Sequence, residues 1–137
     1  MRTRMISNDE LARKWYLIVE KVERSLAHGS GTLSAHGLFL QCMGAAAQCW
    51  IREDEWGCIH GVAITRYEMY ETTKVLGIAV TTSEGWFEHG PDILETIEEF
   101  AKATDCKKVA VYGRKGWKKA LEPYGYKEPY TVLFKEV

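Results

Sequence analysis

The sequence predicts an α+β fold with a mixed, mostly antiparallel sheet flanked by helices, and three observations lead to this expectation. An apolar stripe at helical spacing occupies the first 26 residues. Three strand-like segments with short polar connections then follow one another, which is typical of an antiparallel meander. A helical segment finally joins the third of these strands to a fourth, and a connection of this length favours parallel pairing with a right-handed crossover.

The N-terminal part of the chain predicts two helices. Ser7 and Glu10 have the spacing of a capping box, and the apolar stripe that follows comprises Leu11, Trp15, Ile18, Val22 and Leu26. The first helix is therefore expected over residues 8–28, ending at the glycines near position 30. Residues 33–46 are rich in helix formers but contain two glycines, and we interpret them as a short second helix that packs on the sheet.

The middle of the chain predicts the meander. Strands are expected over residues 47–52, 58–70 and 72–81, with a hairpin turn at residues 53–57. Residues 82–90 are expected to form a loop. Pro91 then suits the first turn of a helix, because its missing N–H would have no helical partner there, and this helix should end near Asp105.

The last third of the chain predicts a strand–helix–strand ending. Residues 109–112 form an apolar strand, a short helical run reaches Leu121, and a turn covers residues 122–126. The alternating apolar residues at 130–134 predict a closing strand.

Composition limits the possible classes of protein. A chain of 137 residues, of which 46% are hydrophobic, is expected to form one domain over residues 1–137 with a substantial core. The net charge of −1 gives no global attraction to nucleic acid. No apolar stretch reaches the ~20 residues of a membrane span. The four cysteines lack paired-ligand spacing, so we predict no metal site and expect packed, reduced thiols. The alternative is a metal site formed by Cys42, Cys49, Cys58 and His60.

The strand–helix–strand ending, with Tyr126 directly after Gly125, resembles the C-terminal half of the GNAT (Gcn5-related N-acetyltransferase) fold, and the predicted order of elements is similar throughout. This resemblance implies a GNAT-like domain. It further implies that acetyl-CoA, if it binds, lies in a V-shaped opening between the strands at 72–81 and 109–112. Its pyrophosphate would contact backbone amides between Gly85 and Asp92, where a helix begins.

The segment before the central helix departs from the GNAT phosphate-binding pattern. Gly85 and Gly90 are present without the family's spacing, and Glu84 and Glu88 would repel a pyrophosphate. Trp86 and Phe87 are bulky where the family has bare backbone. The sequence therefore predicts that the acetyl-CoA site is degenerate, with Gly85, Gly90, Arg114 and Lys115 as the cofactor-binding residues if CoA does bind.

The tyrosine that protonates the CoA thiolate in many GNAT enzymes has no direct counterpart. Laying Gly125 and Tyr126 on the family's Gly-Phe puts Leu121 at the tyrosine position, and leucine cannot donate a proton. Tyr124 lies three residues later and is the candidate catalytic acid. Glu68, Glu71, His60 and His89 are candidates for a general base by their position alone. The alternative is that these residues have only surface or packing roles.

A second resemblance is narrower. Small GNAT-like proteins of tailed phages share a Gly-Arg-x-Gly-Trp segment, an Ala-Leu pair and a Val-Leu-x-Lys-Glu ending, which here begin at Gly113, Ala120 and Val132. Some of these phage proteins are virion-associated. The resemblance implies a protein in the host cytoplasm, possible incorporation in the virion, and other phage or virion proteins as partners.

Two functions follow from these resemblances. The first is a non-catalytic assembly protein without a cofactor, with Trp56, Trp86 and Phe87 as interface residues, because aromatic side chains are enriched in interfaces. The second is an acetyl-CoA-dependent N-acyltransferase with a diverged site. The cations between Lys107 and Lys119 suggest nucleic-acid binding as a third function. The alternative is that these cations only form a solvated surface.

Overall fold

The computed structural model describes residues 1–82, 86–113 and 115–137, and it describes the backbone but not the side chains of residues 86–91. In chain order the elements are β1 (Arg2–Met5), α1 (Asn8–Leu26), α2 (Ala35–Met43), β2 (Ala47–Glu53), β3 (Ile59–Met69), β4 (Lys74–Thr81), α3 (Trp86–Ala103), β5 (Lys108–Val111), α4 (Gly116–Leu121) and the 3₁₀ turn η1 (Glu122–Tyr124). The described helices do not include one that is both long and apolar enough to cross a bilayer.

A mixed sheet forms the middle layer. Within the described residues it has five strands in the order β1-β2-β3-β4-β5. The first four strands pair antiparallel, and β5 pairs parallel to β4. The predicted α+β class, with its meander and its one parallel crossover, is confirmed.

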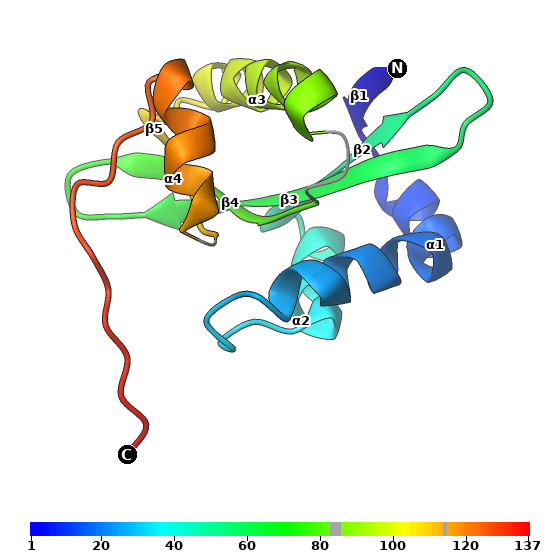
Figure 1. Ribbon diagram of the computed structural model, residues 1–137. Helices are drawn as coiled ribbons and strands as arrows, with labels where there is room; N and C mark the ends of the chain where they lie inside the picture. The colour runs from blue at the N-terminus through cyan, green and yellow to red at the C-terminus, as the bar shows by residue number, and fades with distance from the viewer. Residues whose placement is uncertain (83–85, 114) are drawn as a thin grey trace.

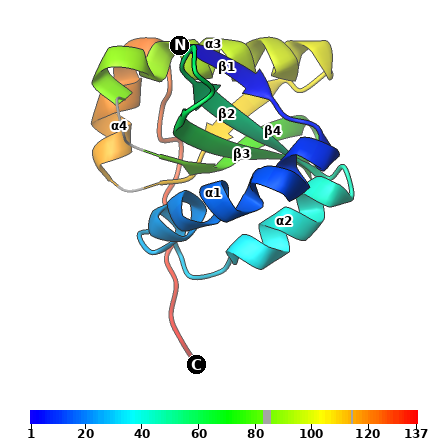
Figure 2. The ribbon, with the colours of Figure 1, turned by 90° about the vertical axis from the view of Figure 1, so that its right-hand side faces the viewer.

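Helices cover both faces of this sheet (Figures 1 and 2). The α1 and α2 helices pack on one face around buried residues that include Ile18, Leu38 and Ile64. The α3 and α4 helices pack on the other face around a second cluster that includes Leu76, Ile97 and Leu121. Successive strand residues alternate between the two clusters, because side chains in a strand point to opposite faces.

The two N-terminal helices begin where a serine caps them. The Ser7 hydroxyl accepts a hydrogen bond from the Glu10 backbone N–H at 3.2 Å, as the capping box predicts. Ser34 does the same for the Gly37 N–H at 3.0 Å, which starts α2. Both predicted N-terminal helices are therefore confirmed, and α1 ends two residues before the predicted His28.

The β1 strand was not predicted, because Arg2–Met5 has no apolar alternation. It pairs with β2 along its whole length, and ion pairs add to this backbone pairing. Arg4 donates from Nε to Glu53 Oε1 at 2.6 Å and from Nη1 to Glu10 Oε1 at 2.7 Å. The Arg4 guanidinium, together with Lys14, lowers the pKa of Glu10 to about 2. The strand is therefore held to β2 and to the start of α1 by ion pairs between partly buried side chains.

Three other predictions need correction. The predicted closing strand at residues 130–134 is not formed, and residues 127–137 run away from the sheet as an extended tail (Figure 1). The α3 helix begins at Trp86, so residues 86–90 are helical where the sequence predicts a loop. Cys58 is exposed, whereas Cys42, Cys49 and Cys106 are buried thiols as expected.

Candidate functional site

The β5 strand ends before β4 does. Their pairing runs from Val75 opposite Lys108 to Ile78 opposite Val111. The Tyr112 N–H still donates to the Ile78 carbonyl at 3.2 Å, but β4 continues to Thr81 with no further β5 partner among the described residues. The end of β4 without a β5 partner lies where the resemblance to GNAT proteins implies an opening between these two strands.

A β-bulge lies at the start of this opening. Ile64 of β3 is opposite Val80, and the next residue, Thr65, is opposite Ile78, so Ala79 is an extra residue in β4. Bulges bend a strand and re-aim its backbone, and they are common beside active sites. Here the bulge coincides with the point at which β4 and β5 separate.

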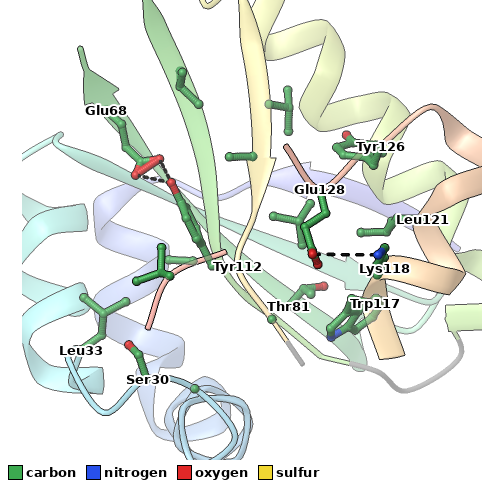
Figure 3. Close-up of a pocket in the computed structure, with 18 of the residues that line it drawn as sticks. Ser30, Leu33, Glu68, Thr81, Tyr112, Trp117, Lys118, Leu121, Tyr126 and Glu128 are labelled. Atoms are coloured by element: carbon green, nitrogen blue, oxygen red, sulfur yellow. Dashed lines mark hydrogen bonds and ion pairs between the residues drawn. The ribbon is translucent and has the colours of Figure 1, made fainter. Parts of the chain in front are cut away.

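A cleft of about 1250 Å³ opens from the divergence onto the α1/α2 face of the sheet (Figure 3). Its walls come from the loop between α1 and α2, from the ends of β3, β4 and β5, from α4 and from the tail. A much smaller pocket lies on the α3/α4 face. Four residues line both pockets: Thr81, Val111, Trp117 and Leu121. The gap between the strands therefore lies between a cleft on one face and a pocket on the other.

A tyrosine–carboxylate pair lies in this cleft (Figure 3). The Tyr112 hydroxyl is 2.7 Å from Glu68 Oε1 and 2.9 Å from Oε2, and it donates to this carboxylate. Both side chains lie over Gly77, where an added Cβ would come within 2.8 Å of Glu68 Cδ. Burial, together with the adjacent Glu68, raises the pKa of Tyr112, so its hydroxyl stays protonated at neutral pH.

The cleft is also lined by cations. Lys115 and Lys118 flank the start of α4, and Lys108 lies on β5. Lys118 Nζ is 3.9 Å from Glu128 Oε1 of the tail, with both side chains about half exposed or more. An exposed pair at this distance contributes little to stability. Lys115 and Lys118 therefore give this side of the cleft positive charge suited to phosphate groups.

The residues predicted from the sequence fall in different places. Lys115 lines the cleft, whereas Gly85 and Arg114 lie outside the described residues. Gly90 lies in the first turns of α3. Tyr124 ends η1 with 47% of its surface exposed and does not line the cleft, so its catalytic role stays a prediction. Nearby Tyr126 does line the cleft, and its hydroxyl donates to Glu98 Oε2 at 3.4 Å.

The candidate bases and the candidate interface residues also lie in different parts of the fold. Of the candidate bases, Glu68 lines the cleft, whereas Glu71 and His60 do not. His60 contacts Asp54 at 2.7 Å in the β2–β3 hairpin. Trp56, at the tip of the same hairpin, is 80% exposed. The side chains of Trp86, Phe87 and His89 lie outside the described part of the chain.

The pairing of Tyr112 with Glu68 was missed in the sequence. The two residues are 44 positions apart, and the sequence predicts Tyr112 only as the end of the strand over residues 109–112. A usable signal was Gly77, a glycine inside an otherwise apolar strand, which often marks a close approach of other groups.

No protein-family model and no curated protein matches the chain. Solved structures do match it over nearly its full length. A GNAT family acetyltransferase from Staphylococcus aureus is 16% identical, with a TM-score of 0.67 and coverage of 99% of this chain and 98% of that one. A putative acetyl transferase from Pyrococcus furiosus is 16% identical, with a TM-score of 0.73 and coverage of 99% and 100%. A predicted acetyltransferase with acetyl-CoA from Clostridium acetobutylicum is 14% identical, with a TM-score of 0.74 and coverage of 98% and 95%.

These likenesses show that the chain has the GNAT acetyltransferase fold. Sequence identities of 14–16% support a shared fold and do not by themselves indicate a shared function. A function for this chain therefore depends on what its cleft can bind.

Proposed function

We propose that the chain binds acyl-CoA in the cleft between β4 and β5 and transfers the acyl group to an amine. The observation that carries this proposal is that β4 continues past its last pairing with β5, starting at the Ala79 bulge. It leaves one edge of β4 without a strand partner, and buried backbone groups need hydrogen-bonding partners. The amide-containing arm of CoA can supply them.

The described residues fit two parts of CoA, its amide-containing arm and its phosphates. The gap lined by Thr81, Val111 and Leu121 suits a narrow, mostly apolar arm. Lys115 and Lys118 suit the phosphates by charge. The sequence argues against a standard pyrophosphate loop, because Glu84 and Glu88 would repel the phosphates. Residues 83–85 lie outside the part of the chain that the structure describes. A weakened phosphate contact is therefore part of the proposal.

The chemistry of this transfer is balanced without a further cofactor. The amine nitrogen attacks the thioester carbonyl carbon, the C–S bond breaks, and the thiolate leaves with the electron pair. Glu68 and Glu128 are the described carboxylates that line the cleft, and Glu68, which lies beside the strand ends, can hold a cationic amine and accept a proton from it. Tyr112, which stays protonated, orients that carboxylate through its hydrogen bond. The cationic amine loses two protons in all: Glu68 accepts the first and releases it to solvent, and the second, lost from the nitrogen after its attack, goes to the thiolate.

Reversing the charge of Lys115 should weaken binding of acetyl-CoA. We expect Lys115→Glu to raise the Kd about 3- to 10-fold, because an exposed cation contributes modestly to anion binding. The measurement is calorimetric titration at low and high salt, and the effect should shrink as salt screens it.

The matched control is Lys102→Glu, a charge reversal on an exposed residue that does not line the cleft. It should leave the Kd unchanged. Equal effects from both variants would mean that the phosphates do not lie beside Lys115.

A second proposal keeps the non-catalytic role suggested by the phage resemblance, in which the chain contacts other phage proteins in the host cytoplasm or virion. The exposed indole of Trp56 favours it, because exposed aromatic side chains commonly anchor interfaces. In particles purified after infection of cells that express the chain, Trp56→Ala should lower its amount at least about fivefold. Glu55→Ala is the control, and an unchanged amount for both variants would exclude Trp56 as the anchor.

A further inference from the structure

Arg66 is a cation of the cleft that has no opposing charge among the described residues. It lies on β3 opposite Gly77, and its partly buried side chain lines the cleft. Its Nε atom is buried with no hydrogen-bond partner in the described part of the chain, and no described carboxylate pairs with the guanidinium. A buried polar group that stays unpaired is costly. This cation therefore favours a ligand that brings a negative charge into the cleft.

Glu68 lies two residues further along the same strand. Side chains two positions apart on a strand point to the same face, so Arg66 and Glu68 both face the cleft, with their Cα atoms about 7 Å apart. The Glu68 carboxylate accepts from the Tyr112 hydroxyl at 2.7 Å (Figure 3). Its oxygens have further lone pairs, so Glu68 can also accept from an amine. The cleft therefore presents a carboxylate and a guanidinium side by side.

The other charges of the cleft disfavour an acceptor that is only cationic. Most of the charged side chains that line the cleft are cations, and its described carboxylates are Glu68 and Glu128. Glu128 already lies 3.9 Å from Lys118. A polyamine or a lysine-rich peptide would meet net positive charge here, which slows its association and opposes its binding. The acceptor that fits this cleft has a cationic amine with an acidic group close to it.

We propose that the acceptor of the acyl group is an α-amino acid, whose amine binds at Glu68 and whose carboxylate binds at Arg66. This inference rests on the proposed acyltransferase function and names its acceptor. An α-amino acid has its amine and its carboxylate on the same carbon atom, so one small molecule can contact both side chains. The planar guanidinium of Arg66 matches a carboxylate in a bidentate geometry. That contact orients the amine for its attack on the thioester, and orientation lowers the barrier of such transfers.

The carboxylate of the acceptor is unchanged by the reaction. The amine nitrogen forms a bond to the acyl carbon, the C–S bond of the thioester breaks, and the thiolate leaves with the electron pair. The ammonium group loses two protons, one through Glu68 to solvent and one to the thiolate. The products are an N-acyl amino acid and CoA. The acylated nitrogen is a neutral amide and has lost its charge-assisted hydrogen bond to Glu68, which favours release of the product.

The test compares amino acids with their amides. Each of the protein L-amino acids is incubated with acetyl-CoA and the chain, and the released CoA thiol is measured. The amino acids that react are then compared with their α-amides, which keep the amine but lack the negative charge. We expect kcat/KM to be at least about tenfold higher for the acid than for its amide. O-Phosphoethanolamine and spermidine test a phosphate-bearing and a purely cationic acceptor.

Arg66→Gln tests the residue that selects the carboxylate. It should lower kcat/KM for the acid at least about tenfold and leave kcat/KM for the amide unchanged, because the amide has no charge for Arg66 to bind. A merely structural role of Arg66 would affect both acceptors equally. The matched control is Arg13→Gln, on an exposed arginine of α1 that does not line the cleft, and it should change neither value. Circular dichroism checks that both variants fold.

Calorimetric titration with acetyl-CoA separates this inference from the function on which it rests. If acetyl-CoA binds but acids and amides react equally well, the inference is overturned and the acyltransferase function stands. The same holds if acetyl-CoA binds and the amines that react include no amino acid. A preference for acids that Arg66→Gln leaves unchanged would also overturn the inference. If acetyl-CoA does not bind, the proposed function and the inference both fail.

Discussion

Thr81→Trp should abolish binding of acetyl-CoA to this chain. Thr81 lines both the cleft and the small pocket on the opposite face of the sheet, at the point where β4 continues without β5. A tryptophan side chain there would fill the gap that the CoA arm needs. We expect the Kd to rise at least about 100-fold, which corresponds to a loss of about 2.7 kcal/mol. Calorimetric titration measures this change.

Thr96→Trp is the matched control for this variant. Thr96 lies on α3, lines neither pocket, and makes only a local hydrogen bond to the Asp92 carbonyl at 2.8 Å. The same substitution there should leave binding unchanged. If Thr81→Trp bound acetyl-CoA as well as the unmodified chain, the ligand could not lie between β4 and β5.

Thr65→Val should lower the free energy of unfolding by roughly 2 to 6 kcal/mol. The fully buried Thr65 hydroxyl accepts from Trp50 Nε1 at 2.9 Å and donates to Gln48 Oε1 at 2.7 Å. Valine has nearly the same shape but no hydroxyl. The change therefore leaves one buried donor and one buried acceptor unpaired, at about 1 to 3 kcal/mol each.

Urea denaturation followed by fluorescence would measure this loss, with an unchanged m-value if the unfolded state is unaffected. Thr65→Ser retains the hydroxyl and should recover most of the stability, apart from the methyl group. If valine and serine were equally tolerated, the hydrogen-bonded chain through Trp50 would not stabilise the sheet.

Much of the fold could be predicted because its signals are local. The capping box at Ser7 and the apolar stripe from Leu11 locate α1 within a few residues. The short polar turns around residues 53–57 and 71–73 separate the meander strands. These features depend on hydrogen bonds and side-chain periods within a few positions, so the sequence contains them directly.

The two ends of the sheet could not be predicted in the same way. The β1 strand depends on Arg4 meeting Glu53, 49 positions away, and an Arg-Thr-Arg-Met segment has no pattern of its own. Residues 130–134 have a strong strand pattern but pair with no strand among the residues that the structure describes. Strand formation requires a neighbouring edge, which periodicity alone does not provide.

One part of the candidate site could likewise be predicted from the sequence and another part could not. The parallel pairing of β4 and β5 followed from the predicted order of elements, since one crossover helix joins them, and the opening between them was implied by the resemblance to GNAT proteins. The pair formed by Glu68 and Tyr112 did not, because it requires β3 and the end of β5 to meet over Gly77. Tyr124 was predicted because it lies three residues after the family's tyrosine position at Leu121, and η1 positions it outside the cleft walls.

The most direct test of the central claim is calorimetric titration of the purified chain with acetyl-CoA, with free CoA as the control. If the divergence of β4 and β5 is an acyl-CoA site, acetyl-CoA should bind with a Kd in the range of about 1 to 100 micromolar, which corresponds to roughly −8 to −5.5 kcal/mol. No heat at millimolar acetyl-CoA would contradict the account and would leave a GNAT fold that works without the cofactor.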